Sequence, residues 1–178
     1  TAYEIGVRLV GSEMCIRDRS TKIMGDPLDE VDMGPMVSAS ARDEIHNQVE
    51  RAIESGADLR LGGHMPDGPG FYYPITLLVD VKPGMAAFDE EIFGPVFSVI
   101  KANDEAEALS LANQTEFGLG AAVFTRDKIK GEEIAKKHLD AGLCFVNDFV
   151  KSDPSMVYAF NPNPLAQWVA STALVSDA

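Results

Sequence analysis

The sequence predicts an α/β fold, with βαβ units around a mostly parallel sheet. In the second half of the chain, short apolar runs alternate with segments of helical periodicity, in the order strand, helix, strand, helix, strand. The chain has 178 residues, of which 46% are hydrophobic and 24% charged. It is therefore long enough to bury a core and polar enough to be globular and soluble.

The first half begins with an amphipathic helix. Apolar residues recur with helical spacing from residue 38 to residue 56, where Ser38 or Ser40 can act as the N-cap and Gly56 ends the helix. A short strand at 59–61 follows, and then the sequence GGHMPDGPG, which predicts a surface loop because Gly and Pro dominate it. Residues 76–81 are apolar and β-branched, and we expect a strand there.

The second half contains the alternating elements. We expect strands at 96–100, 121–125 and 143–146, and helices at 104–113 and 127–142. Asp104 followed three residues later by Glu107 is a capping box, which fixes the start of the first of these helices. Ligands of parallel sheets gather at the carboxyl ends of the strands, so the corners after Phe124 and Val146 are candidate functional regions.

The charge of the chain disfavours some partners. A formal net charge of −13 opposes nucleic acid and anionic membrane surfaces, because both attract clustered Lys and Arg. No apolar run approaches the roughly 18 residues that span a bilayer, and no secretory pattern is visible at the N-terminus. We therefore expect a cytoplasmic protein with no nucleic acid and no membrane partner.

Cysteine and histidine give no sign of a metal site or a disulfide framework. The two cysteines are Cys15 and Cys144, and the second lies in the apolar run LCFV, where a free cysteine is usually a small buried hydrophobic residue. None of His46, His64 and His138 has a second His or Cys at metal-ligand spacing. We expect no metal and no disulfide.

The segment FDEEIFGPV, residues 88–96, has the composition of a ligand-contacting corner. It joins two carboxylates, Glu90 and Glu91, to the aromatic Phe93 and the turn Gly94–Pro95. From the residues alone, the two glutamates also fit a solvated helix end, Phe93 a core anchor, and Gly-Pro a helix stop.

Seven motifs place this corner in a larger pattern. In order between Gly25 and Pro154, they are GDPLDE, MGP, the GG of LGGH, YYPITLL, EEIFGPV, NQTEFGLGAAVFT and GLCFVNDFVKSDP. Together they resemble the C-terminal part of the catalytic domain of the NAD(P)-dependent aldehyde dehydrogenase superfamily. The segment FVNDFVKSDP is most similar to the succinate-semialdehyde dehydrogenase branch. Seven ordered motifs are far more specific than any one of them.

The resemblance implies a cofactor, NAD or NADP, and roles for the corner residues. By resemblance, Glu91 accepts hydrogen bonds from the hydroxyls of the nicotinamide ribose, and Phe93 packs near the nicotinamide. A carboxylate suits the first role because its two oxygens can take two donors side by side. Glu90 is interpreted as a surface charge, and Gly94 and Pro95 as residues that shape the corner.

The resemblance also implies a substrate region for a small aldehyde at NDFVKSDP. Ser152 stands where succinate-semialdehyde dehydrogenases place a small hydroxyl residue near the distal carboxylate of the substrate. A turn residue ahead of Asp-Pro explains Ser152 equally well, and Lys151 is interpreted as a solvated charge. Asn113 and Thr115 are interpreted as structural, because polar residues between a helix end and a strand usually bond local backbone groups.

Both ends of the chain depart from the pattern. Residues 1–19 match nothing in the family, and VGSEMCIRDRS resembles translated adapter sequence that recurs at the ends of gene models, so we expect this segment to be non-native. After SDP, the family continues with a Gly-rich, basic stretch and a last strand used in oligomerisation. This sequence differs there. We expect a partial aldehyde dehydrogenase catalytic domain at 20–155 and an anomalous, loosely packed tail at 156–178.

The family's reaction, as the resemblance implies it, uses a cysteine thiolate, a hydride acceptor and a glutamate base. Neither cysteine of this chain matches the nucleophile, so we assign no catalytic residue. We expect a fragment that is inactive alone, from a parent enzyme that is a homo-oligomer and oxidises an aldehyde, with succinate semialdehyde as the expected substrate. The alternative is a non-catalytic acidic α/β module that binds a protein, and the hydrolase and acylating branches of the superfamily stay open.

Overall fold

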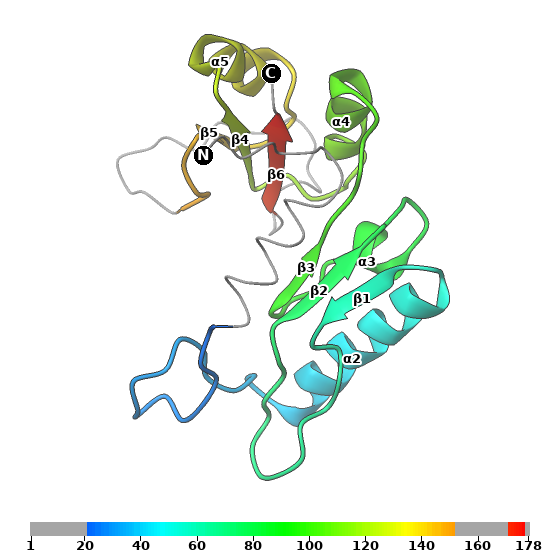
Figure 1. The fold of residues 1–178 in the computed structure, drawn as a ribbon, viewed down its shortest axis with the longest axis vertical. Coiled ribbons are helices and arrows are strands. Elements are labelled where there is room, and N and C mark those ends of the chain that lie inside the picture. Colours follow the sequence, from blue (N-terminus) through cyan, green and yellow to red (C-terminus); the bar gives the residue numbers. More distant parts are fainter. Residues whose placement is uncertain (1–20, 152–170, 177–178) are drawn as a thin grey trace, which may run out of the picture. The chain divides into compact units, whose positions relative to one another are not determined.

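The computed structural model describes residues 21–151 and the backbone of 171–176. The chain divides into two compact units, Thr1–Lys101 and Ala102–Ala178 (Figure 1). The predicted non-native segment 1–19, the residue Ser152 and most of the predicted tail lie outside the described residues.

The first unit is built on helix α2, Ala39–Glu54, which confirms the predicted amphipathic helix. The Ser38 hydroxyl caps it by accepting a hydrogen bond of 3.1 Å from the backbone N–H of Ala41. Gly56 follows the helix with a φ of +106°, a conformation that glycine adopts at little cost. The helix therefore begins and ends where its capping residues predict.

The sheet of the first unit has three strands in the order β1-β2-β3, and α2 packs against it (Figure 1). The strands are β1 (Asp58–Leu61), β2 (Thr76–Val79) and β3 (Val96–Ser98). The β1–β2 pair is antiparallel and the β2–β3 pair is parallel. β2 and β3 are each two residues shorter than predicted.

The core of this unit lies between α2 and the sheet. Its fully buried side chains come from both layers, and they include Ile45, Val49, Ala52, Tyr73, Leu78 and Val81. Their burial removes apolar surface from water, which is the main force that holds the two layers together.

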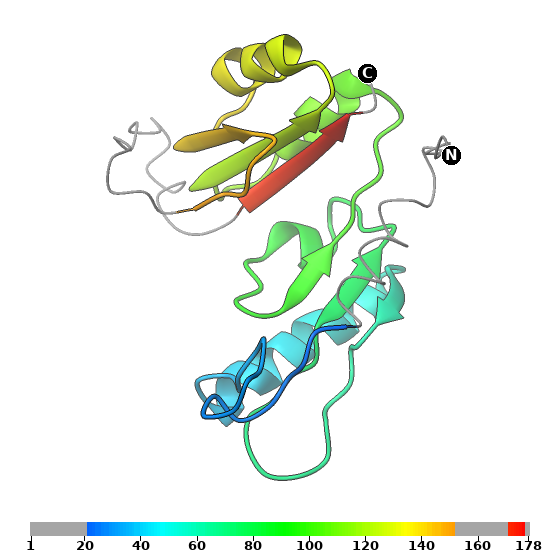
Figure 2. The same ribbon diagram turned by 60° about the vertical axis from the view of Figure 1, so that its left-hand side comes forward.

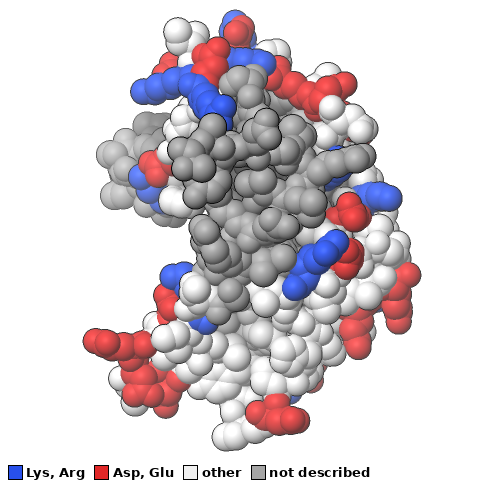
Figure 3. All heavy atoms as spheres, viewed as in Figure 1, with Lys and Arg blue, Asp and Glu red and all other residues white. Residues whose placement is uncertain are grey.

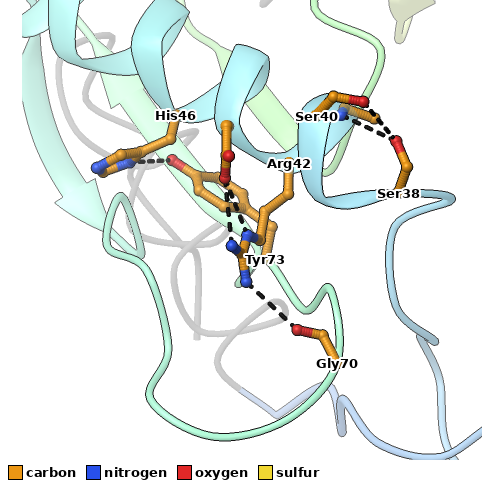
Figure 4. A network of polar contacts seen from close by, with 8 residues as sticks. Ser38, Ser40, Arg42, His46, Gly70 and Tyr73 are labelled. Carbon is orange, nitrogen blue, oxygen red and sulfur yellow. Dashed lines mark hydrogen bonds and ion pairs between the residues drawn. The ribbon is translucent and has the colours of Figure 1, made fainter.

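Polar contacts fix the Gly- and Pro-rich loop against α2 (Figure 4). The guanidinium Nη1 of Arg42 donates to the carbonyl oxygen of Gly70 at 3.3 Å. One turn further along, Nδ1 of His46 lies 3.2 Å from the hydroxyl of Tyr73. The loop is thus tied to the helix on both sides of residue 71, as a loop without regular structure of its own requires.

A four-residue helix, α3 (Ala86–Asp89), precedes the EEIFGP segment. The sequence analysis set no bounds for it, although a helix end at the two glutamates was one interpretation. Four residues are too short to show helical periodicity, so the pattern could not reveal this helix. Its C-cap is Glu90, whose backbone is extended, with φ −108° and ψ 152°. The chain therefore leaves the helical conformation at the first of the two glutamates.

The second unit has a parallel sheet in the order β5-β4-β6 (Figure 2). Its elements are α4 (Glu105–Ala112), β4 (Gly120–Thr125), α5 (Lys128–Lys137), β5 (Leu143–Val146) and β6 (Ser171–Ser176). β4, α5 and β5 form the predicted βαβ unit, and the predicted Asp104 cap is confirmed by its hydrogen bond to the Glu107 N–H at 2.8 Å. Three of the four strand pairs in the described residues are parallel, which confirms a mostly parallel α/β fold.

The end of α5 differs from the prediction. α5 ends at Lys137 with His138 as its C-cap, not at Gly142, and the side chain of Asn113 binds the chain just beyond it. Asn113 donates to the His138 carbonyl at 2.8 Å and accepts from the Asp140 N–H at 3.0 Å. These contacts replace helix hydrogen bonds, so the helix stops early.

β6 gives part of the predicted tail, 156–178, a regular backbone structure, while the loose packing expected there stays a prediction. Residues 171–176 pair with all six residues of β4, from Gly120 opposite Ser171 to Thr125 opposite Ser176. The sequence STALVS has no alternation of apolar and polar residues, and only its pairing with a distant strand defines it as a strand. The domain boundary at residue 156 stays a prediction.

Candidate functional site

The corner that follows α3 is held by the backbone at several points. The Glu90 N–H bonds to the Ala86 carbonyl at 3.0 Å, which ends the helix. Two successive three-residue turns follow, because the N–H of Gly94 bonds to Ile92 and the N–H of Val96 to Gly94, both at 2.8 Å. The Pro95 carbonyl accepts from the Thr76 N–H at 2.8 Å and joins the corner to β2.

Gly94 brings this corner into close contact with α2. A Cβ atom at Gly94 would collide with Cδ1 of Ile45 and lie 3.2 Å from its Cγ1. Ile45 is 2% exposed and belongs to the core, so it has little room to move aside. This close approach explains the glycine, which confirms that Gly94 shapes the corner.

Glu91 has an unsatisfied oxygen at this corner. Its Oε1 atom is buried and has no hydrogen-bond partner in the part of the chain that the structure describes. A buried carboxylate oxygen without a donor costs free energy, and such atoms are rare unless they serve a ligand. Glu91 therefore has one acceptor atom whose hydrogen bond is not made within the described residues.

Phe93 lies two residues further on and is 67% exposed. The interpretation of Phe93 as a core anchor is wrong, because a core aromatic loses nearly all of its exposed area. An exposed phenyl ring offers an apolar surface to a planar ligand. The two predicted cofactor-binding residues thus lie on the same corner.

Glu90 is a surface charge as predicted, since its side chain is 39% exposed, and it is also held in an ion pair. Its two carboxylate oxygens accept from Nη1 and Nη2 of Arg51, at 2.6 and 2.7 Å, in a bidentate ion pair. Nε2 of Gln48 also donates to Glu90 Oε2, at 3.1 Å. The hydrogen bonds from Arg51, and then the one from Gln48, hold the pKa of Glu90 below its usual range.

One sign of this network is visible in the sequence and was overlooked. Gln48 is 6% exposed and lies on the apolar face of α2, where a polar side chain needs a partner. Its partners are Glu90 and the backbone carbonyl of Glu91, the latter at 3.2 Å. Arg51 is three residues further along the same helix, so both side chains reach the corner.

In the second unit, Asn147 ties together the carboxyl ends of β4 and β5. Its side-chain oxygen accepts from the Thr125 N–H at 2.8 Å, and its amide nitrogen donates to the Thr125 carbonyl at 2.9 Å. Asn147 has a φ of +54°, a conformation that asparagine tolerates better than most residues. This contact, which the sequence analysis missed, fixes the start of the NDFVKSDP segment.

Beyond Asn147, the candidate substrate segment is described only as far as Lys151. Lys151 is exposed to solvent as predicted, and its Nζ also pairs with Asp148 Oδ2 at 2.7 Å. Hydrogen bonds from Lys151, and then from the Phe149 N–H, lower the pKa of Asp148. The predicted role of Ser152 lies outside the described residues.

Cys144 has the surroundings of a structural cysteine. It lies on β5 and is half-buried, and burial raises the pKa of its thiol, which disfavours the thiolate. The structural interpretation of Asn113 and Thr115 is confirmed, since Thr115 Oγ1 accepts from the Phe117 N–H at 3.1 Å and Asn113 binds the end of α5.

On the face shown in Figure 3, acidic and basic side chains are interspersed over the described residues. Among the described residues, Lys22 pairs with Asp32 at 2.7 Å and Lys130 with Glu105 at 2.6 Å. Within the described residues, no cluster of three or more His, Cys, Asp or Glu side chains could hold a metal ion. In the same part of the chain, no helix is long and apolar enough to cross a membrane.

Comparison with known proteins finds relatives that are named as succinate-semialdehyde dehydrogenases. A succinate semialdehyde dehydrogenase [NAD(P)+] of Escherichia coli (strain K12) is 42% identical over 156 residues, which are 87% of this chain and 34% of that protein. A succinate-semialdehyde dehydrogenase [NADP(+)] of Mycobacterium avium (strain 104) is 42% identical over 134 residues, which are 75% of this chain and 28% of that protein. The chain thus spans about a third of the length of these relatives.

Solved structures show the same likeness. The succinic semialdehyde dehydrogenase of Streptococcus pyogenes in complex with NADP+ has a TM-score of 0.77 and 30% identity, over 81% of this chain and 32% of that one. An aldehyde dehydrogenase of Mycobacterium tuberculosis complexed with NAD+ has a TM-score of 0.70 and 32% identity, over 82% and 29%. The family model for the aldehyde dehydrogenase family matches residues 13–161. With its α/β units, its EEIFGP corner and these matches, the chain belongs to the aldehyde dehydrogenase family.

Proposed function

We propose that this chain forms the wall around the nicotinamide ribose, and part of the aldehyde-binding region, of an NAD(P)-dependent aldehyde dehydrogenase. The observation that carries the proposal is the buried, unpartnered Oε1 of Glu91, on the same corner as the exposed ring of Phe93, within the described residues. The relatives support the cofactor, because two of them are named as NAD(P)+ or NADP(+) enzymes. They also support succinate semialdehyde as the substrate.

The chemistry of the corner fits a ribose. The two neighbouring ribose hydroxyls are donors, and an ionised carboxylate is an acceptor with two oxygens side by side. Glu91 offers such a carboxylate, with one oxygen that lacks a donor in the described part of the chain. Two hydroxyls would satisfy that oxygen and its neighbour, and hydrogen bonds to a charged group are among the stronger ones.

Within this function, the residues of the chain bind the cofactor and orient its nicotinamide ring. When it is bound, the nicotinamide supplies the hydride acceptor for aldehyde oxidation. Glu91 fixes the ribose, and Phe93 limits the movement of the ring beside it. Holding a reactant in the reactive geometry can contribute much of a rate enhancement. Because burial raises the pKa of Cys144, we assign the thiolate nucleophile to no described residue, and we infer that the 178-residue chain is inactive alone.

The substrate region is proposed at the carboxyl end of β5. Asn147 fixes the start of this segment through Thr125, and Lys151 lies beyond it with its pair to Asp148. Contact of Ser152 with the distal carboxylate of succinate semialdehyde, a homo-oligomeric parent and a cytoplasmic location remain predictions.

The proposal is tested in a hybrid enzyme in which residues 25–151 replace the matching segment of the E. coli relative. We expect Glu91→Gln to lower the rate of hydride transfer in a single turnover by about ten- to hundredfold, because a charge-assisted hydrogen bond is lost. Glu54→Gln, which changes an exposed carboxylate at the end of α2, is the matched control and should leave the rate unchanged. If Glu91→Gln is as harmless as the control in a folded hybrid, the cofactor role of the corner is wrong.

A further inference from the structure

We propose that Glu90, together with Arg51 and Gln48 of α2, positions Glu91 for its ligand. These three are positioning residues, since their side chains bind one another and the backbone of the corner. The inference rests on the proposed cofactor role of Glu91 and adds to it the group of side chains that makes the role possible. It assigns different roles to the two adjacent glutamates of EEIFGP. Glu90 contacts the protein, and Glu91 contacts the ligand.

The backbone conformation separates the two side chains. Glu90 has an extended backbone, and in an extended chain, successive side chains point to opposite sides. Glu90 is directed to α2, where it meets Arg51. We therefore expect the Glu91 side chain to point away from Arg51, and its Oε1 has no partner among the described residues. Fixing the first glutamate therefore fixes the direction of the second.

The contact with Arg51 has a defined geometry. Arg51 uses Nη1 and Nη2 for the two oxygens of Glu90, at 2.6 and 2.7 Å, and Nε for Oδ1 of Asn47, at 3.0 Å. A guanidinium held at three donors has a fixed plane, and a carboxylate bound to it in bidentate fashion is fixed in that plane. Lysine has the charge but not this fork, so geometry and charge can be separated by experiment.

Gln48 links the side chain of one glutamate to the backbone of the next. Its Nε2 donates to Glu90 Oε2 at 3.1 Å and to the Glu91 carbonyl oxygen at 3.2 Å. An amide buried on an apolar helix face is unfavourable unless it is hydrogen-bonded, and both of these bonds go to the corner. The ion pair itself is exposed to solvent, and such pairs add little to global stability. Local order at the corner is therefore the expected effect of the network.

The structural part is tested in the 178-residue chain by amide hydrogen exchange. Glu90→Gln and Arg51→Lys should speed exchange of the Gly94 and Val96 amides, which bond within the corner, by about two- to tenfold. Exchange in β4 should not change. Glu133→Gln, which removes an exposed ion pair with Lys137 in the second unit, is the matched control and should leave the corner amides unchanged. Unchanged exchange in both corner variants would overturn the proposal.

The functional part uses the hybrid enzyme and a double-mutant cycle. Glu90→Gln and Arg51→Lys should each lower single-turnover hydride transfer several-fold while thermal stability stays near that of the parent hybrid. In a Glu91→Gln background, Glu90→Gln should have no further effect, because its influence passes through Glu91.

The outcomes separate this inference from the proposed function. A harmless Glu91→Gln refutes the cofactor role and leaves the exchange result to decide whether the network orders the corner. A harmful Glu91→Gln with a silent Glu90→Gln, or with additive effects in the double variant, refutes the positioning role alone. Where Glu90→Gln fails to fold, Arg51→Lys provides the same test with the charge retained.

Discussion

At the scale of single residues, the EEIFGP corner shows how neighbours in sequence acquire different functions. Glu90 is bound by Arg51 and Gln48, and its pKa is lowered by their hydrogen bonds. Glu91 keeps a buried oxygen without a partner in the described part of the chain. Neither residue type nor spacing distinguishes the two, because the difference depends on which side of an extended backbone faces α2.

Replacing Gly94 by alanine is predicted to destabilise the first unit. The added Cβ would collide with Ile45, which is packed in the core, so we expect a loss of about 1–3 kcal/mol. Gly34→Ala is the matched control, since a Cβ there would meet only Pro27 Cβ, at an ordinary 3.8 Å. Denaturant unfolding measures both variants. Equal stability of the two would show that the corner and α2 are less closely packed than described.

We predict that the free energy of unfolding falls at alkaline pH because of Tyr73. Burial raises the pKa of its phenol from 10.0 to about 12. Above about pH 10, the unfolded chain releases this proton while the folded chain keeps it, so rising pH favours unfolding until the folded pKa is reached. The free energy of unfolding should therefore fall by roughly 2–3 kcal/mol between about pH 10 and 12. Denaturant titrations at several pH values measure it.

The control for this prediction is Tyr73→Phe, which has no phenol to titrate but also lacks the contact with His46. Its stability at neutral pH should be lower than that of the parent chain. Its decrease between about pH 10 and 12 should be smaller by the contribution of Tyr73. An equally steep decrease in both proteins would assign the alkaline transition to other groups.

At the scale of helices and strands, the sequence predicted the elements with strong local signals. α2, α4 and β5 follow from capping residues, periodicity and an apolar run, and each lies within two residues of its predicted bounds. α3 and β6 were missed because four helical residues show no period and β6 is defined by its pairing with β4. Long-range contacts likewise decide where α5 ends, since Asn113, the C-cap of α4, binds the chain just beyond its last residue.

In the candidate site too, residues with a local sequence signal were predicted, and residues that depend on long-range contacts were not. The motif predicted Glu91 and Phe93, and both lie on one corner as expected. The place of Gln48 on the apolar face of α2 was an overlooked sign that it needs a partner. The pairing of Arg51 and Gln48 with Glu90 could not be predicted, because Glu90 is about forty residues away and no local pattern links them. Asn147 was missed for a similar reason, since Thr125, which it binds, lies on the neighbouring strand.

The packing of α5 on its sheet predicts an unusual effect of a helix substitution. Alanine normally favours a helix over glycine by about 1 kcal/mol. At Gly131, however, a Cβ would lie 2.7 Å from Thr125 Cγ2 and 2.9 Å from Val146 Cγ1. We expect Gly131→Ala to destabilise the second unit by about 1–3 kcal/mol. Thermal unfolding of the variant measures this loss.

Ile129→Ala is the matched control on the same helix. Ile129 is 84% exposed, so its truncation removes little packing and slightly improves helix propensity, and the variant should be as stable as the parent chain. A stabilising Gly131→Ala would mean that helix propensity outweighs the close approach of α5 to β4 and β5.

At the scale of the whole molecule, we proposed that the described residues bind and orient the cofactor and do not supply the nucleophile. This proposal depends on which side chains can react. The chain places acceptor, apolar and positioning groups around the Glu91 corner, and Cys144 lies on a strand. Since only the thiolate attacks a carbonyl, a thiol whose pKa is raised by burial is a poor nucleophile near neutral pH. The described residues therefore fit binding and orientation better than covalent catalysis.

The last prediction tests, in the 178-residue chain itself, whether the chain lacks a reactive nucleophile. With succinate semialdehyde and NAD or NADP, it should reduce no more cofactor than a control without protein. In a Cys15→Ser variant, where Cys144 is the remaining thiol, alkylation near neutral pH should be at least about tenfold slower in the folded than in the unfolded chain, because burial both shields the sulfur and disfavours the thiolate. The two measurements are independent, since the first requires cofactor and the second does not. Cofactor reduction that Cys144→Ala abolishes, together with rapid alkylation of the folded protein, would make Cys144 a nucleophile, and the chain would then be an enzyme in its own right.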